Sequence, residues 1–286
     1  MLPPEPEHGR KTFPLISECD LSSVSHNSIA ADLDGTLLKG TLSFPYYILV
    51  AIDAGSLLRG LILLMSLPII SVIYIFVSEH IAGKMLIFIT FAGIKIRNIE
   101  AASRTVLPRF YAADVRRDSF EVFNSCQKKV IVTANPIVMV NTFSTEFLGA
   151  EKVIGTEIEV DQRTKRATGF VVEPGVLIGE WKKLAVMKEF GDDLPDIGIG
   201  DRKSDHDFMS VCKEGYMVPK DHFASLVSPQ CLRSQSIFQD GYLERPSSYV
   251  VDYIWLPLRF LLYPFRAYIN LTLIEGILKC AYRQMW

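Results

Sequence analysis

Short runs of small and β-branched residues, each followed by a polar residue, recur along the chain and predict buried parallel strands. The first run is 29–31, and Asp32 comes directly after it. Similar runs lie at 129–133 and 196–201, and 215–218 is a fourth candidate. Segments with helical spacing separate the runs. This alternation of strand and helix predicts an α/β fold with a doubly wound parallel sheet.

The segments between these strands suggest further elements. Residues 99–128 predict an amphipathic helix and a charged connection, and a second helix is predicted to start at Pro136. Residues 153–160 alternate between apolar and polar positions like one strand, with 168–172 as its hairpin partner. Residues 179–190 predict a helix that carries two lysines in its first turns.

An abrupt change to apolar composition begins at Phe44 and continues to Ile96. Residues 61–77 contain no charge, but these 17 residues are at the lower limit for crossing a bilayer, and Pro68 interrupts them. Residues 85–94 are too short to span alone. The stretch predicts an inserted apolar helical cap or membrane segment, and the alternative is a buried helical subdomain.

The predicted organisation divides the chain into a core and an insertion. A core of 28–43 and 128–235 is interrupted by the cap or membrane-associated insertion at 44–127. Residues 1–27 are polar and predict a flexible lead. Residues 250–286 are apolar but broken by prolines and arginines, which favours a tail that lies in the membrane interface.

Overall composition supports contact with a membrane and disfavours nucleic acid. The 286 residues are 49% hydrophobic, and the mean hydropathy is +0.22. The first 28 residues contain no apolar run, so we expect membrane attachment through an internal segment. The net charge is −2 and the 30 basic residues are dispersed, so no basic surface for DNA or RNA is visible.

The cysteines show neither metal-ligand nor disulfide spacing. Because they are far apart and odd in number, we interpret them as free thiols in a reducing compartment. They are Cys19, Cys126, Cys212, Cys231 and Cys280.

Two acids follow the first predicted strand. Asp32 and Asp34 stand where ligands bind in α/β sheets, and Gly35 allows the chain to leave the strand sharply. Acids separated by one residue point to the same side of an extended chain, so the two could share one site. The alternative is an Asp-Gly turn with solvated acids.

Further polar residues follow the later strands and begin the helix over 179–190. In chain order, the set is Asp32 with Asp34, Thr133, Lys182, and Asp201 with Asp205. All can converge on one sheet edge. Phosphoryl transfer through a covalent aspartate needs such a set: a nucleophile, an acid/base, groups that hold phosphoryl oxygens, and acids that bind Mg²⁺.

The motifs DLDGT, Thr133, the lysine and GDRKSD resemble those of the haloacid dehalogenase superfamily. The resemblance implies that Asp32 is the nucleophile and Asp34 the acid/base, and that Thr133 and Lys182 hold phosphate. The implied Mg²⁺ ligands are Asp32, Asp34, Asp201 and Asp205. Lys183 is the alternative to Lys182, and Asp207 the alternative to Asp205. Taken singly, each residue could instead be a surface charge or a turn residue.

A closer resemblance covers nearly the whole chain. The segments AADLDGTLL, SFPYY, VLPRFYA, TGFVVEPGVLIGE, VMKEFG and GDRKSDHDFMSVCKEGYMVP are similar to the N-terminal half of land-plant sn-2 glycerol-3-phosphate acyltransferases of the cutin and suberin pathways. In that family a phosphatase-like domain precedes a membrane acyltransferase domain. Members with intact acids remove phosphate from 2-acyl lysophosphatidic acid. The resemblance implies an endoplasmic reticulum membrane location, a cytosolic catalytic domain and a lysophospholipid or glycerol-phosphate substrate.

The chain departs from the family in two ways. Ile137 stands where the family often has Arg. No histidine has an Asp five positions later, as the acyltransferase signature His-x4-Asp requires, so we expect no acyl transfer by this chain. The histidines are His8, His26, His80, His206 and His222.

Three functions are compatible with these patterns. The leading hypothesis is a Mg²⁺-dependent, membrane-associated phosphomonoesterase that converts 2-acyl lysophosphatidic acid to 2-monoacylglycerol. The alternatives are a non-catalytic membrane partner of full-length acyltransferases and a soluble phosphatase with a small polar substrate. Because Asp32 precedes the apolar stretch and Asp201 follows it, the stretch must enter and leave on the same side. We therefore favour a cap or shallow hairpin over two spans.

Overall fold

The computed structural model of the chain describes residues 13–19, 27–221 and 223–232. Five parallel strands form one sheet in the order β3-β2-β1-β6-β7. They are β1 (Ser28–Ala31), β2 (Lys128–Pro136), β3 (Lys152–Thr156), β6 (Ile197–Gly200) and β7 (Glu214–Met217). The central strand is β1, where Ala30 pairs with Val130 on one side and Gly198 on the other. The predicted doubly wound α/β sheet is confirmed.

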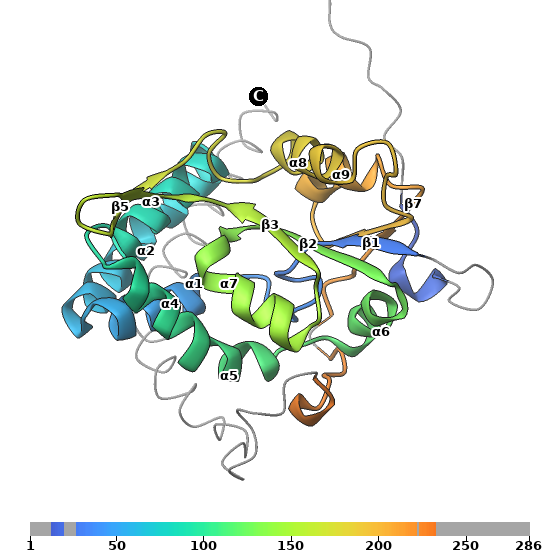
Figure 1. Cartoon of the computed structure of the whole chain (residues 1–286), viewed down its shortest axis with the longest axis horizontal. Coiled ribbons are helices and arrows are strands. Elements are labelled where there is room, and N and C mark those ends of the chain that lie inside the picture. Colours follow the sequence, from blue (N-terminus) through green and yellow to red (C-terminus); the bar gives the residue numbers. More distant parts are fainter. Residues whose placement is uncertain (1–12, 20–26, 222, 233–286) are drawn as a thin grey trace, which may run out of the picture. The chain divides into compact units, whose positions relative to one another are not determined.

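Helices cover both faces of the sheet (Figure 1). On one side lie α8 (Glu180–Phe190) and α9 (His206–Met209), and on the other α6 (Arg117–Ser125) and α7 (Ile137–Thr142). Val130 and Val132 pack with Val186 and Phe208 in one buried cluster. Successive side chains of a strand alternate between faces, so the intervening Ile131 is directed to the opposite layer. The β-branched pattern of β2 therefore explains why both faces are buried.

The insertion after β1 forms a helical cap. Its helices are α1 (Phe44–Val50), a π-turn (Ala51–Gly55), α2 (Leu57–Phe76), α3 (Glu79–Phe91), α4 (Ile96–Thr105) and α5 (Leu107–Ala112). The guanidinium of Arg59, near the start of α2, donates to the carbonyls of Ile89, Thr90 and Ala92 at the end of α3. These bonds make α2 and α3 an antiparallel hairpin.

The long cap helix α2 differs from the prediction. It has 20 residues, begins four residues earlier than the predicted stretch and continues through Pro68. The hydroxyl of Ser56 caps it by accepting from the backbone N–H of Arg59 at 3.2 Å. Pro68 removes one helical hydrogen bond, but Leu63 and Ile70 on either side of it are buried and hold the helix. Of the described helices, α2 alone is long and apolar enough to cross a membrane.

The single strand predicted over 153–160 is wrong, because the chain forms two strands there. β3 stays in the main sheet, where the hydroxyl of Thr156 donates to the carbonyl of Ala134 at 2.6 Å. β4 (Ile158–Asp161) then turns away and pairs antiparallel with β5 (Arg166–Val171). β5 packs on α3, with the rings of Phe88 and Phe170 5.5 Å apart. This hairpin, predicted as part of the core, thus braces the cap.

Short helical turns complete the described chain at Ile16–Glu18, Phe143–Phe147, Lys203–Asp205 and Pro229–Cys231. The first belongs to the predicted flexible lead over 1–27. Within the described part of that lead, Leu15 bridges to Met217 of β7 and Ile16 is buried. The predicted interface tail over 250–286 lies outside the described residues.

Candidate active site

Asp32 follows β1 directly and is held at the centre of the sheet edge. Its carboxylate accepts from Lys182 Nζ at 2.6 Å and from the hydroxyl of Thr36 at 3.2 Å. Gly35 turns the chain away with a positive φ of +80°, and a Cβ there would lie 2.4 Å from an Asp201 oxygen. Only glycine fits this turn, because it must pass so close to a second acid of the site.

Lys182 in α8 links two of the predicted acids. Its ammonium also donates to Asp205 Oδ1 at 2.7 Å, and all three side chains of this triad are buried. Lys183 is only half-buried, so Lys182 is the lysine that reaches the site. Asp205 is buried whereas Asp207 is exposed, so Asp205 is the acid of this pair that reaches the site.

Three carboxylates form a compact cluster of possible metal ligands. Oxygens of Asp32, Asp201 and Asp205 all lie within 4.8 Å of one another. Neither oxygen of Asp201 has a hydrogen-bond partner in the described part of the chain, although both are buried. Burial raises the pKa of Asp32 to about 8 and that of Asp201 to about 6. A buried, oxygen-only set in which Asp201 accepts no hydrogen bond from the described residues fits a hard divalent cation such as Mg²⁺.

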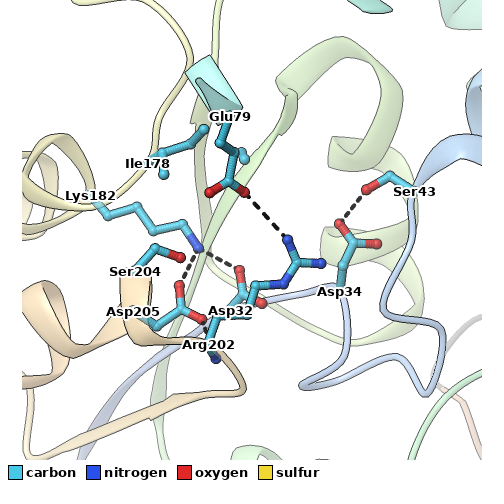
Figure 2. Close-up of a pocket in the computed structure, with 10 residues that line it drawn as sticks. Asp32, Asp34, Ser43, Glu79, Ile178, Lys182, Arg202, Ser204 and Asp205 are labelled. Atoms are coloured by element: carbon cyan, nitrogen blue, oxygen red, sulfur yellow. Dashed lines mark hydrogen bonds and ion pairs between the residues drawn. The ribbon is translucent and has the colours of Figure 1, made fainter. Parts of the chain in front are cut away.

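Asp34 faces a different set of partners. Its Oδ2 accepts from Ser43 at 2.8 Å and from Asn135 at 2.6 Å, and its Oδ1 is buried without a hydrogen-bond partner among the described residues. Burial raises its pKa. The structure does not bring this side chain into the metal-ligand cluster that the resemblance implied. The reason is local: the chain turns after Asp32 instead of staying extended, so the two acids diverge (Figure 2).

Thr133 is not among the residues that line the pocket above Asp32. It is fully buried, and its hydroxyl accepts from the backbone N–H of Asn135 at 3.1 Å. The strand was predicted to end at Thr133, but β2 continues to Pro136, and its pairing with β3 shifts register after Val132. This irregularity places Ala134 in the pocket wall instead.

The pocket contains residues that sequence analysis missed. Figure 2 shows Glu79 of the cap helix α3 above the core residues, with its Oε1 3.5 Å from Nη1 of Arg202. Ser43, Ile178 and Ser204 complete the wall. Arg202 directly follows Asp201 in the GDRKSD motif, and that adjacency was the available signal. Glu79 lies in a segment with no recognisable site pattern, so only the fold reveals it.

Four carboxylates and two cations line this pocket, and Asp201 adds a fifth carboxylate beside it. Opposite charges compensate only part of the negative charge, so a bound cation is electrostatically favourable. Ile137 lines other cavities and is absent from this wall. Among the described residues that line the pocket, Arg202 alone carries a guanidinium.

Comparison with known proteins identifies the family. The model described as "Glycerol-3-phosphate acyltransferase RAM2-like, HAD-like domain" matches residues 28–218. The chain belongs to this family. It is 45% identical over 234 residues to glycerol-3-phosphate acyltransferase RAM2 of Petunia hybrida, a match that covers 80% of this chain and 48% of that protein.

A second relative, glycerol-3-phosphate acyltransferase 1 of Arabidopsis thaliana, is 32% identical over 276 residues, which cover 89% of this chain and 46% of the relative. The chain thus spans about half the length of these relatives. Among solved structures, a protein of unknown function from Bordetella pertussis Tohama I superposes with a TM-score of 0.51 at 15% identity, covering 67% of this chain and 89% of that one. That likeness concerns the fold alone.

Proposed function

We propose that this domain is a Mg²⁺-dependent phosphomonoesterase that hydrolyses 2-acyl lysophosphatidic acid to 2-monoacylglycerol and phosphate. The observation that carries the proposal is the buried cluster of Asp32, Lys182, Asp201 and Asp205 beside an acid, Asp34, with separate partners. The family supports the substrate class, since its named members act in glycerol-3-phosphate acylation.

In the first step, an oxygen of Asp32 attacks phosphorus, and the bond between phosphorus and the glycerol oxygen breaks. Lys182 and Thr36 orient the carboxylate, because each holds one of its oxygens. Of these, the Lys182 ammonium also reduces the repulsion between the anionic nucleophile and the anionic phosphate.

The leaving glycerol oxygen needs a proton, and Asp34 is placed to supply it. Burial favours the protonated form of Asp34, as its raised pKa indicates. Ser43 and Asn135 fix one oxygen and leave Oδ1 available for the proton. In the second step, the ionised Asp34 accepts a proton from the water that attacks the aspartyl phosphate, which restores both acids.

The cluster of Asp32, Asp201 and Asp205 would hold Mg²⁺. When bound, this ion supplies positive charge that offsets repulsion between the nucleophile and the phosphate. Arg202 adds a guanidinium at the pocket wall for the phosphate oxygens. Phosphate holding thus falls to Lys182 and Arg202 in this proposal, while the role implied for Thr133 is limited to supporting the strand end.

We further propose that the cap lies on the endoplasmic reticulum membrane with the catalytic core in the cytosol. Many apolar residues of α2 are exposed, among them Leu61, Met65, Ile69 and Phe76. A helix of this length extends about 30 Å, yet both of its ends are tied to the folded domain. Arg59 bonds to the end of α3, and Glu79, just beyond α2, pairs with Arg202 of the core. This supports an in-plane helix over a crossing one.

The decisive experiment is phosphate release by the purified chain from 2-acyl lysophosphatidic acid, with Mg²⁺ and with a chelator. We expect Mg²⁺-dependent release, and faster release than from glycerol 3-phosphate, which lacks the acyl chain. Equal rates on both substrates would contradict the lipid substrate. No release from either, by protein that still shows a cooperative thermal transition, would overturn the phosphatase.

A further inference from the structure

A second polar cavity lies at the far end of α2 from the pocket around Asp32. It has a volume of about 320 Å³ and is lined by residues from the π-turn, the starts of α2 and α4, the α3–α4 connection and β5. Its charged side chains are Arg59, Lys95, Arg97 and Arg166. Because α2 extends about 30 Å, this cavity is separate from the candidate active site.

Among the described residues, the four cations have no carboxylate partner. In the described part of the chain, none of them forms an ion pair, whereas Arg116, Arg202 and Lys213 each do. The hydrogen bonds of Arg59 to the end of α3 and of Arg166 to the carbonyl of Gly93 go to neutral groups. These bonds fix two guanidinium groups beside the cavity without neutralising them, so their positive charge remains available to bind an anion.

Two helix N-termini add to this positive potential. Ser56 is the N-cap of the 20-residue helix α2, Lys95 is the N-cap of the ten-residue helix α4, and both line the cavity. The helix dipole favours negative charge at such positions. Gly93 lies between them, and nothing occupies the space within 4 Å of where its Cβ would be. The entrance is therefore open.

The cavity borders exposed apolar residues at the start of α2. Leu57, Leu58 and Leu61, in the first turns of α2, are 75%, 65% and 54% exposed. A cationic cavity beside an exposed apolar helix face matches the surface of an anionic bilayer, where phosphate groups lie next to acyl chains. We propose that this cavity binds the phosphate of an anionic phospholipid headgroup while the exposed face of α2 lies among the neighbouring acyl chains.

The proposal rests on the membrane contact proposed above but is independent of phosphatase activity. Its test uses the full chain and co-sedimentation with vesicles of phosphatidylcholine alone or of phosphatidylcholine mixed with phosphatidylserine. We expect tighter binding to the mixed vesicles, and a loss of that preference in high salt.

The test variant carries Lys95→Gln and Arg97→Gln, because no hydrogen bond of either side chain contributes to the described fold. The matched control carries Arg109→Gln and Lys188→Gln, two exposed cations outside the cavity. We expect the test variant to lose about tenfold or more in affinity for the mixed vesicles, at roughly 1 kcal/mol for each basic residue near the surface, and the control to lose less. Equal losses would show a diffuse charge effect and overturn the site.

Two other ligands would be recognised by their own outcomes. Binding of free glycerol 3-phosphate or inorganic phosphate in the absence of vesicles, abolished in the test variant, would assign the cavity to a soluble anion. A dimer in light scattering that does not bind either kind of vesicle would assign the α2 face to a second copy. Repeating the vesicle assay with Asp32→Asn separates the two proposals, since vesicle binding should persist when turnover is lost.

Discussion

The carboxylate of Glu79, at the start of cap helix α3, lies 3.5 Å from the guanidinium of Arg202 in the core. Arg202 also donates to the carbonyl of Thr41 and lies 3.6 Å from Asp201, so it is surrounded by acceptors. A substrate phosphate would have to compete with Glu79 for this guanidinium. The cap therefore contributes a negative charge to a pocket whose proposed substrate is itself an anion.

Replacing Glu79 should strengthen substrate binding. We expect Glu79→Gln to lower KM for 2-acyl lysophosphatidic acid about threefold to tenfold with little change in kcat, because one repulsive charge is lost. Arg202→Gln should have the opposite effect and raise KM by about tenfold or more. Steady-state kinetics of both variants provide the check, and a higher KM in Glu79→Gln would show that the acid binds substrate.

Asp32→Asn should abolish turnover while leaving the fold intact. The amide has nearly the same shape and still accepts a hydrogen bond from Lys182, but it cannot form the aspartyl phosphate. We expect kcat to fall by about 1000-fold or more, with Tm unchanged or raised. Asp192→Asn, at an exposed position, is the matched control. Substantial phosphate release by Asp32→Asn would exclude the aspartyl mechanism.

Asp201→Asn should weaken Mg²⁺ binding. The substitution removes one charged oxygen ligand, and we expect a loss of about 10- to 100-fold in Mg²⁺ affinity. Without the metal, the variant should be at least as stable as the wild type. The reason is that the buried Asp201 carboxylate of the wild type has no hydrogen-bond partner among the described residues. Thermal unfolding across a Mg²⁺ titration measures both effects. An unchanged Mg²⁺ dependence would place the ion elsewhere.

Mg²⁺ should stabilise the protein more at high pH than at low pH. The pKa of Asp32 is about 8 in the folded chain and near 4 when unfolded, so between these values the folded state retains a proton that the unfolded state has released. Stability without metal therefore falls as pH rises through this range. Mg²⁺ binds the ionised carboxylates, so its Tm increase should be larger at pH 8 than at pH 5. Equal increases would contradict this coupling.

Shortening a buried side chain of α2 should destabilise the protein more than shortening an exposed one. Leu63 is fully buried, whereas Leu61 is 54% exposed. We expect Leu63→Ala to reduce the free energy of unfolding by about 2–5 kcal/mol, and Leu61→Ala to change it little. Chemical denaturation in buffer or mild detergent distinguishes them. Similar small effects would mean that α2 does not pack as described.

The core of the fold could be predicted from the sequence because its strands are apolar runs followed by polar residues, as Asp32 follows β1 and Asp201 follows β6. This signal located Asp32 and Asp201, and the helix start and the GDRKSD motif added Lys182 and Asp205; the structure brings these four side chains together. The local signal failed where geometry depends on distant contacts. The partners of Asp34 show this: its Oδ2 accepts hydrogen bonds from Ser43 and Asn135, and Asn135 is 101 positions away.

The boundaries failed for related reasons. Alternation over 153–160 was real, but it could not show that the chain changes sheets near Glu157, since both strands share the pattern. The register shift after Val132 likewise depends on pairing with β3, so it cannot be predicted from the sequence of β2 alone. Whether Pro68 breaks a helix depends on the neighbours that hold both sides, which hydropathy alone does not reveal.

The packing of β5 on cap helix α3 affects the order in which the chain folds during synthesis. The hairpin of α2 and α3 leaves the ribosome well before residues 166–171, which later cover one side of α3. In that interval its apolar faces have no β5 to pack against, a state that favours aggregation. A nascent chain made in the presence of membranes can place these faces at the bilayer surface at once. We therefore expect translation with microsomes present from the start to give less aggregated protein than adding microsomes after synthesis.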